Sequence, residues 1–152
     1  MHRKSSMEIK INQLTKATQE VLDKINYLLT VLSAESSMLT FDMLVEIINS
    51  ENSTIFIAED NGEIVGMMTF VTYRIPSGFK AWIEDVAVDK SMQGKGIGKA
   101  LIEKAIECAN QLNISKIDLT TAPFRVAANI LYQKIGFVKR DTNVYRLLSN
   151  YV

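Results

Sequence analysis

The residues whose types and spacing best suit a chemical task form a glycine-rich run in the second half of the chain. They are Gln93, Gly94, Lys95, Gly96, Ile97, Gly98 and Lys99. Glycine allows tight backbone turns and the close approach of a ligand. A helical apolar repeat follows, and a helix N-terminus presents unpaired N–H groups and a partial positive charge. The sequence therefore predicts a pyrophosphate-binding loop, to which Lys95 and Lys99 add charge.

Two common nucleotide-binding motifs do not match this loop. A P-loop requires G-x-x-x-x-G-K-[ST], but Gln93 stands at the first glycine and Ala100 at the hydroxyl residue. A dinucleotide fingerprint requires G-x-G-x-x-G, and Lys99 stands at its third glycine. A nucleotide-binding domain is therefore the disfavoured alternative, which titration with ATP or NAD tests.

The elements that position the loop follow from periodicity, turns and caps. Alternating apolar residues predict strands over residues 7–13, 54–59, 64–73, 82–88, 116–121, 137–140 and 144–148. Helical spacing, with caps at Thr40 and Gly136, predicts helices over residues 18–33, 41–48, 97–113 and 125–135. The turn at Asn61-Gly62 makes the early strands antiparallel, whereas the unit over 82–121 is expected to be parallel.

These elements indicate an α/β fold. We expect one mixed, mostly antiparallel sheet of about six to seven strands, flanked by about four helices. No repeat or linker divides the chain, so residues 7–152 are expected to form a single domain after a disordered tail at residues 1–6.

The composition narrows the possible functions. The 152 residues include 17 basic and 17 acidic side chains, which argues against nucleic acid as the main partner. Cys108 is the only cysteine and His2 the only histidine, so an intrachain disulfide is excluded, and we expect neither a metal site nor a Ser-His-Asp mechanism. No apolar run approaches the ~20 residues that span a bilayer. We therefore expect a cytoplasmic protein without a membrane partner.

Residues 81–137 resemble the GNAT superfamily of N-acetyltransferases. The family's first motif is Gln or Arg, two residues, Gly, one residue, and Gly or Ala, directly after a strand; Gln93, Gly96 and Gly98 match it. Its second motif is similar to Ala128–Phe137, which reads ANILYQKIGF. The resemblance implies a GNAT-like fold, acetyl-CoA as acyl donor, and a possible homodimer.

The same resemblance implies a cofactor site. It places the CoA pyrophosphate on residues 93–99 and the pantetheine arm beside the strand at Val86, Ala87 and Val88. It also places Asn129 on the CoA arm and Tyr132 near the sulfur. Val86 and Val88 suit a core equally well, so their assignment comes from the resemblance alone.

Acyl transfer to an amine makes three chemical demands. The amine must lose a proton, because a lysine-type amine has a pKa of ~10.4. The oxyanion needs hydrogen-bond donors, and the leaving thiolate gains from a proton donor. Tyr132 is the candidate acid, on one helix face with Asn129, although the position also suits a core tyrosine.

Glu84 is the candidate general base, acting directly or through water. The spacing of two residues predicts that it shares a strand face with Val86. A solvated carboxylate, or a partner for Arg74 or Lys80, explains Glu84 equally well.

The sequence thus predicts an enzyme, an acetyl-CoA-dependent N-acetyltransferase that transfers acetyl directly to a primary amine of a small molecule or peptide. The alternative is a non-catalytic acyl-CoA-binding sensor or regulatory module, which needs the glycine loop but neither Glu84 nor Tyr132. The acceptor depends on the loops over residues 33–40 and 73–80, which vary freely on a given fold.

Overall fold

The computed structural model describes residues 7–150, and the tail expected at residues 1–6 lies outside the described residues. The chain divides into two compact units, one up to Thr120 and one from Thr121 onward. The single domain expected over residues 7–152 stays a prediction, and each unit is described by itself below.

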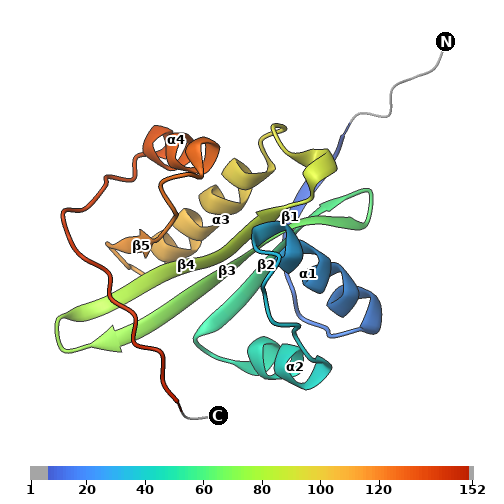
Figure 1. Ribbon diagram of the computed structural model, residues 1–152, viewed down its shortest axis with the longest axis horizontal. Coiled ribbons are helices and arrows are strands. Elements are labelled where there is room, and N and C mark those ends of the chain that lie inside the picture. Colours follow the sequence, from blue (N-terminus) through green and yellow to red (C-terminus); the bar gives the residue numbers. More distant parts are fainter. Residues whose placement is uncertain (1–6, 151–152) are drawn as a thin grey trace. The chain divides into compact units, whose positions relative to one another are not determined.

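One five-stranded sheet forms the centre of the first unit (Figure 1). Its strands are β1 (Ile9–Gln13), β2 (Ser53–Asp60), β3 (Glu63–Ile75), β4 (Gly78–Val88) and β5 (Ile117–Leu119), and they lie in that order. The pairs β1–β2, β2–β3 and β3–β4 are antiparallel, and the pair β4–β5 is parallel. The mixed, mostly antiparallel sheet and the parallel unit are therefore confirmed.

The helices of this unit are α1 (Gln19–Leu32), α2 (Phe41–Asn49) and α3 (Ile97–Gln111), with a short 3₁₀ turn, η1, over Lys90–Met92. Threonine caps start the first two helices. Thr18 Oγ1 accepts a hydrogen bond from the Val21 N–H, and Thr40 Oγ1 accepts one from the Met43 N–H, both at 3.2 Å. These bonds satisfy N–H groups that the first turn of a helix leaves unpaired.

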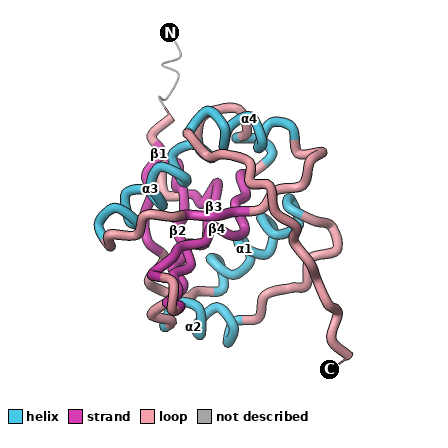
Figure 2. Tube along the Cα trace, turned by 90° about the vertical axis from the view of Figure 1, so that its left-hand side faces the viewer, coloured by secondary structure: helices cyan, strands magenta, loops and turns pink. Residues whose placement is uncertain are grey.

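The sheet has a helical layer on each side (Figure 2). Ile55 and Ile57 of β2 pack in one apolar cluster with Leu28 of α1 and Leu44 of α2. The intervening Phe56 faces the other side, where the Lys104 ammonium of α3 lies 5.9 Å from its ring centroid. Because successive strand side chains alternate between faces, both faces of β2 are buried, and apolar burial on two sides stabilises the sheet.

Gly66 brings α3 close to the sheet. A Cβ at this position would lie 3.1 Å from Ile97 Cγ2 and 3.2 Å from the Ala87 carbonyl oxygen. Both distances are tighter than ordinary van der Waals contact. Glycine at β3 therefore lets the first turn of α3 sit against the end of β4, which fixes where the glycine-rich loop begins and ends.

The second unit contains one helix, α4 (Val126–Ile135), followed by Gly136 with φ of +123°. The strands predicted over residues 137–140 and 144–148 are wrong, because the structure has no strand after α4 in the residues it describes. The sheet consequently has five strands rather than six to seven. An alternating pattern gives a strand only where a neighbouring backbone pairs with it, and residues 137–150 take part in no strand pairing among the described residues.

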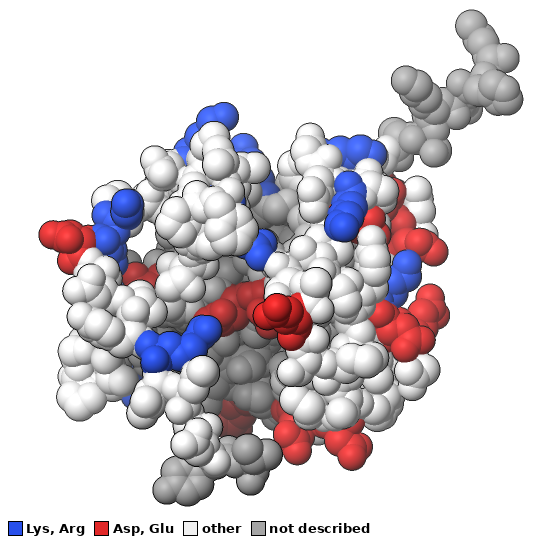
Figure 3. Space-filling model, in the orientation of Figure 1, with Lys and Arg blue, Asp and Glu red and all other residues white. Residues whose placement is uncertain are grey.

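Side chains of both charges are visible on the face drawn in Figure 3. On the face drawn in Figure 3, the basic groups of the described residues lie among acidic ones and form no continuous stripe. Across residues 7–150, no helix is both long and apolar enough to cross a membrane.

Candidate functional site in two parts

The glycine-rich loop turns the chain from β4 into α3 with its backbone N–H groups free. Gly94 and Gly96 have φ values of +76° and +83°, and Gly96 is the N-cap of α3. Within the described residues, the first backbone N–H of this stretch with a hydrogen bond is that of Ala100, which donates to the Gly96 carbonyl at 3.1 Å. A Cβ built at Gly94 or Gly96 would meet no atom within 4 Å. Open space therefore faces unpaired donors, an arrangement that fits a pyrophosphate.

Asp89 fixes the start of this loop. Its Oδ1 accepts hydrogen bonds from the Ser91 N–H at 2.9 Å and the Ser91 hydroxyl at 2.8 Å. These bonds, with a smaller contribution from the charge of Lys24, hold the pKa of the Asp89 carboxyl below its usual value. At neutral pH the carboxylate is thus ionised, and it caps η1 just before the glycines.

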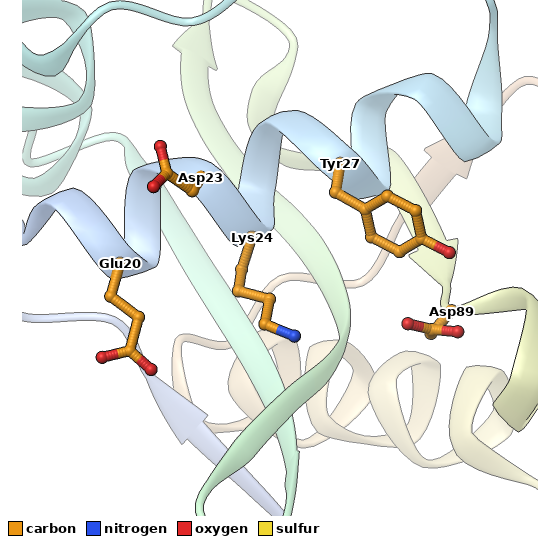
Figure 4. Close-up of a pocket in the computed structure, with 5 residues that line it drawn as sticks. All are labelled: Glu20, Asp23, Lys24, Tyr27 and Asp89. Atoms are coloured by element: carbon orange, nitrogen blue, oxygen red, sulfur yellow. The ribbon is translucent and has the colours of Figure 1, made fainter.

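A shallow depression of about 550 Å³ flanks Asp89. Figure 4 shows the side chains of α1 along one wall and Asp89 across from Lys24 and Tyr27. The residues lining it are Glu20, Asp23, Lys24, Tyr27 and Asp89. Lys24 also forms a 3.8 Å ion pair with Glu63, which links α1 to β3 beside the depression.

The edge of β4 facing β5 is open just before the loop. β5 pairs with β4 only at Ala81, Trp82 and Ile83, and no other described strand covers the rest of that edge. The Asp89 N–H donates to the Val65 carbonyl of β3 at 2.8 Å. Because backbone polar groups alternate between the two edges of a strand, those of Val88 and Val86 point to the open edge.

Gln93 turns back to this edge: its Nε2 donates to the Val88 carbonyl at 3.2 Å. The structure therefore brings together two predicted parts of the cofactor site, the strand residues 86–88 and the loop residues 93–99. Both parts belong to the first unit. By the same alternation, the backbone N–H of Val86 points to the edge of β4 that β5 leaves unpaired, where an extended ligand can pair with it.

A bulge at Asp85 interrupts the alternation of β4. Thr69 of β3 pairs with Glu84 and Met67 pairs with Ala87, so two residues of β4, Asp85 and Val86, lie opposite one residue of β3. Asp85 has φ of +50°, a left-handed conformation that aspartate tolerates better than most residues. Such bulges re-aim side chains and are frequent next to active sites.

The bulge corrects the predicted orientation of Glu84. Directly paired residues share a face, so Glu84 shares a face with Thr69, and Ala87 shares one with Met67. Thr69 and Met67 are two residues apart in β3 and point to the same side, that of α1 and α2. Glu84 therefore lies on the face of Ala87 and opposite to Val86, because the extra residue inverts the alternation between them.

Both carboxylates at the bulge reach solvent. Partial burial of the Asp85 carboxyl nevertheless raises its pKa. Neither predicted ion-pair partner holds Glu84 among the described residues: Arg74 instead lies over the Phe79 ring, 3.8 Å from its centroid. Sequence reasoning missed the role of Asp85, for which the one available signal is an aspartate inside a strand, where that residue is depleted.

In the second unit, the amide of Asn129 braces the start of α4. Its Nδ2 donates to the Ala122 carbonyl at 3.0 Å and to the Arg125 carbonyl at 2.8 Å. Both amide hydrogens are thereby used, which fixes the side chain and leaves Oδ1 as the atom able to accept a hydrogen bond from a ligand.

Tyr132 follows on the same helix three residues later, which places it on the face of Asn129. Its ring packs edge-on against Phe137, with centroids 5.9 Å apart, and its carbonyl accepts the Phe137 N–H at 2.9 Å. The turn at Gly136 thus supports the ring. Burial raises the pKa of the Tyr132 phenol, partly offset by Arg125, so the hydroxyl stays protonated at neutral pH.

The profile of the acetyltransferase (GNAT) family matches residues 23–137, more than half of the chain. The chain belongs to this family. Mouse (Mus musculus) N-acetyltransferase family 8 member 3 is 30% identical over 104 residues, which make up 67% of this chain and 46% of that protein. The chain thus spans about half the length of the curated relatives it matches first.

Solved structures share the fold. A putative acetyltransferase from Agrobacterium tumefaciens str. C58 superposes with a TM-score of 0.79 at 25% identity, over 91% of this chain and 99% of that one. Aminoglycoside N-acetyltransferase AAC(6')-Iy, solved in complex with CoA, superposes with a TM-score of 0.77 at 17% identity, over 96% and 98% of the two chains. The GNAT-like α/β fold expected from the motifs is confirmed.

Proposed function

We propose that this protein is an acetyl-CoA-dependent N-acetyltransferase that acetylates a primary amine of a small molecule or peptide by direct transfer. The observation that carries the proposal is the open edge of β4 running into a loop of free N–H groups. In acetyl-CoA, an extended arm that contains amides leads from the acyl thioester to a pyrophosphate. In the protein, the open strand edge likewise leads directly into the loop of free N–H groups.

The loop and strand bind the acyl donor through their backbone. The N–H groups of residues 94–99 and the N-terminus of α3 hold the pyrophosphate, and Lys95 and Lys99 add positive charge. The backbone of Val86 and Val88 pairs with the amides of the pantetheine arm as a further strand would. The side chain of Asn129 accepts a hydrogen bond from the arm through Oδ1.

Catalysis needs a base for the amine and an acid for the thiolate, while acetyl-CoA supplies the activated acetyl group as a thioester. Glu84 takes the proton from the amine, directly or through water. The Val86 N–H stabilises the acyl oxygen as it gains charge. Tyr132 donates its phenolic proton to the leaving sulfur, a role that its raised pKa permits at neutral pH.

The bulge gives Glu84 and Val86 separate tasks. Because they point to opposite faces of β4, the carboxylate serves the side of the sheet covered by α1 and α2, where we place the amine. The N–H of Val86 serves the strand edge, where we place the thioester. A regular strand would direct both side chains to one face.

The setting of the enzyme follows from its composition. A chain with one cysteine suits the cytoplasm, which is a reducing compartment. Its net charge of zero lacks the basic excess that is typical of a nucleic-acid-binding protein. We further propose that the enzyme forms a homodimer, that residues 7–152 form a single domain, and that catalysis uses no metal.

Thiol release from acetyl-CoA tests the proposal with a panel of polyamines, amino acids, aminoglycosides and peptide N-termini. We expect release that depends on one class of amine and an acetylated product with one added acetyl group by mass. Tight acetyl-CoA binding without release in any sample would favour the non-catalytic acyl-CoA sensor. Absence of acetyl-CoA binding would contradict both.

A further inference from the structure

The face of the sheet that carries Glu84 continues along the β3–β4 hairpin with mostly apolar side chains. The two strands pair in regular register over residues 69–75 and 78–84. Directly paired residues share a face, and successive residues of a strand alternate between faces. The residues that share the face of Glu84 in this hairpin are Thr69, Val71, Tyr73, Ile75, Lys80 and Trp82. We call these six residues the hairpin face.

The hairpin face is covered only in part, in contrast to the opposite face of the same strands. Phe70, Ala81 and Ile83 on the opposite face are at most 3% exposed. On the hairpin face, Ile75 is 40% exposed and Trp82 is half-buried. Figure 1 shows the hairpin extending away from α1 and α2 toward the left of the view. A contiguous group of exposed apolar residues usually marks a binding surface, so a ligand has room here.

Trp82 lies at the centre of the hairpin face. Val71 is its direct partner in β3, and Asp118 is its direct partner in β5. The Cβ atoms of directly paired residues in an antiparallel pair lie about 4.5–5.5 Å apart, so Val71 extends the apolar surface of the indole. No described residue accepts a hydrogen bond from the indole N–H. A bound molecule can therefore contact the ring and pair with its N–H.

Glu84 lies two residues from Trp82 on the same strand and the same face. Two residues of a strand span about 7 Å. An acceptor whose amine reaches the Glu84 carboxylate therefore places the group attached to that amine over Trp82. An aromatic or aliphatic group at this point gains from leaving water and from packing on the indole.

The charges around Trp82 do not suit an acceptor with several positive charges. Besides Glu84, the charged neighbours of Trp82 on this face are Lys80 in β4 and Asp118 in β5. Their opposite charges balance, and neither residue forms an ion pair with another residue that the structure describes. A polyamine or an aminoglycoside would meet the Lys80 ammonium, and like charges held close together disfavour binding.

We infer that the acceptor is an amine of single positive charge that carries an aromatic or aliphatic group within about 7 Å of its nitrogen, and that Trp82 selects it. The inference rests on the proposed acetyltransferase function and deepens it, because it concerns the acceptor of the same reaction. In this arrangement Trp82 contacts the apolar group, while Glu84 serves the amine.

The fluorescence of Trp82 tests this inference without any acetyl transfer. Trp82 is the only tryptophan of the chain, so its emission reports what binds on the hairpin face. The probes are phenylalaninamide, lysinamide and alaninamide, which differ only in their side chains. With CoA in place of acetyl-CoA, phenylalaninamide should change the emission at a concentration roughly tenfold below that of the other two. Equal titration curves, or a curve led by lysinamide, would overturn the inference.

Kinetics with acetyl-CoA provide the second measurement. In the wild type, kcat/KM for phenylalaninamide should exceed that for alaninamide about tenfold or more, and the ratio should fall to about one in Trp82→Ala. Phe79→Ala is the matched control, because Phe79 is another aromatic residue of β4 that lies on the opposite face, beside Arg74. This control should keep the wild-type ratio.

An unchanged ratio in Trp82→Ala, or an equal loss in Phe79→Ala, would overturn the inference. Trp82→Phe keeps a ring and should retain part of the preference. If Trp82→Ala fails to fold by circular dichroism, the ratio in Trp82→Phe and the emission of the wild type decide.

The two measurements also separate this inference from the proposed function. Acetylation of an amine that leaves the emission of Trp82 unchanged would overturn the inference and leave the acetyltransferase intact. A change of emission by phenylalaninamide, without acetyl transfer to any amine, would support the apolar amine site and contradict the proposed enzyme. Absence of both emission change and transfer would overturn both.

Discussion

The glycine-rich loop and helix α4 contribute to the proposed site by different means. The loop offers backbone N–H groups, and its shape depends on positive φ at Gly94 and Gly96. Helix α4 offers side chains, namely the braced amide of Asn129 and the partly buried phenol of Tyr132. Binding by the loop depends on the conformation of its backbone and tolerates changes of side chain. The contribution of α4 depends instead on the functional groups of two side chains. Substitutions should therefore separate binding from chemistry.

The largest effect is expected at Tyr132. Tyr132→Phe keeps the edge-on packing with Phe137 but removes the proton donor, so turnover should fall roughly 100- to 10,000-fold with acetyl-CoA affinity nearly unchanged. Because burial raises the pKa of this phenol, wild-type turnover should not decline until the pH exceeds about 10, the usual tyrosine value. Steady-state kinetics over a pH range measure both effects.

Tyr145→Phe is the matched control for Tyr132→Phe, since Tyr145 is 87% exposed and should tolerate the change. If Tyr132→Phe has wild-type turnover throughout, the leaving thiolate needs no acid from this residue. An unfolded variant would instead indicate a structural hydroxyl.

The carboxylates at the bulge come next in expected size. Glu84→Gln should lower turnover about 100-fold at neutral pH, at the low end for a general base, and recover in part at high pH, where the free amine is abundant. Asp85→Asn removes the neighbouring charge from the bulge itself, and the turnover of this variant should show no such recovery at high pH. A loss in Glu84→Gln that is equal at all pH values would assign Glu84 to acceptor positioning rather than proton transfer.

A substitution at Gly96 tests whether the glycine-rich loop binds acetyl-CoA through its backbone. Gly96→Val places a side chain in the open space before the loop, and acetyl-CoA should bind at least tenfold weaker, or about 1.4 kcal/mol. Gly62→Val is a close control, because Gly62 also has φ of +83° and open space at its Cβ position. Backbone strain is then similar in both variants, and calorimetry should find weaker binding only in Gly96→Val. Equal affinities would mean that the loop is merely a turn.

The smallest effect concerns the stability of the bulge. Asp85→Gly should leave the free energy of unfolding nearly unchanged, because glycine adopts positive φ readily. Asp85→Val should lower it by about 1–2 kcal/mol, since a β-branched residue is strained there. Urea denaturation measures both. Similar stability in the two variants would show that positive φ at this position is not maintained in solution.

Local patterns predicted most of the fold because their causes are local. An apolar stripe marked α1, the threonine cap at Thr40 marked the start of α2, and the Asn61-Gly62 turn set the β2–β3 hairpin, so these elements could be predicted from neighbouring residues. The bulge could not, because no glycine marks Asp85 and its conformation depends on pairing with β3. The orientation predicted for Glu84 was wrong for that reason.

The end of the chain shows the opposite case. Residues 144–148 carry a strand pattern that the structure does not realise, because pattern alone supplies no pairing partner. For the site, the glycine loop could be predicted from residue types and spacing. The roles of Asn129 and Tyr132 came from family resemblance, and they stay predictions.

Thermal unfolding with acetyl-CoA tests the central claim most directly, that the β4 edge and its glycine loop bind this acyl donor. A ligand at about 100 times its dissociation constant adds ~2.7 kcal/mol of stability, which for a chain of this size raises the melting temperature by roughly 5–10 °C. We predict this rise for the wild type and for Gly62→Val, and its loss in Gly96→Val. No rise with saturating acetyl-CoA, together with a clear rise with ATP or NAD, would contradict the account.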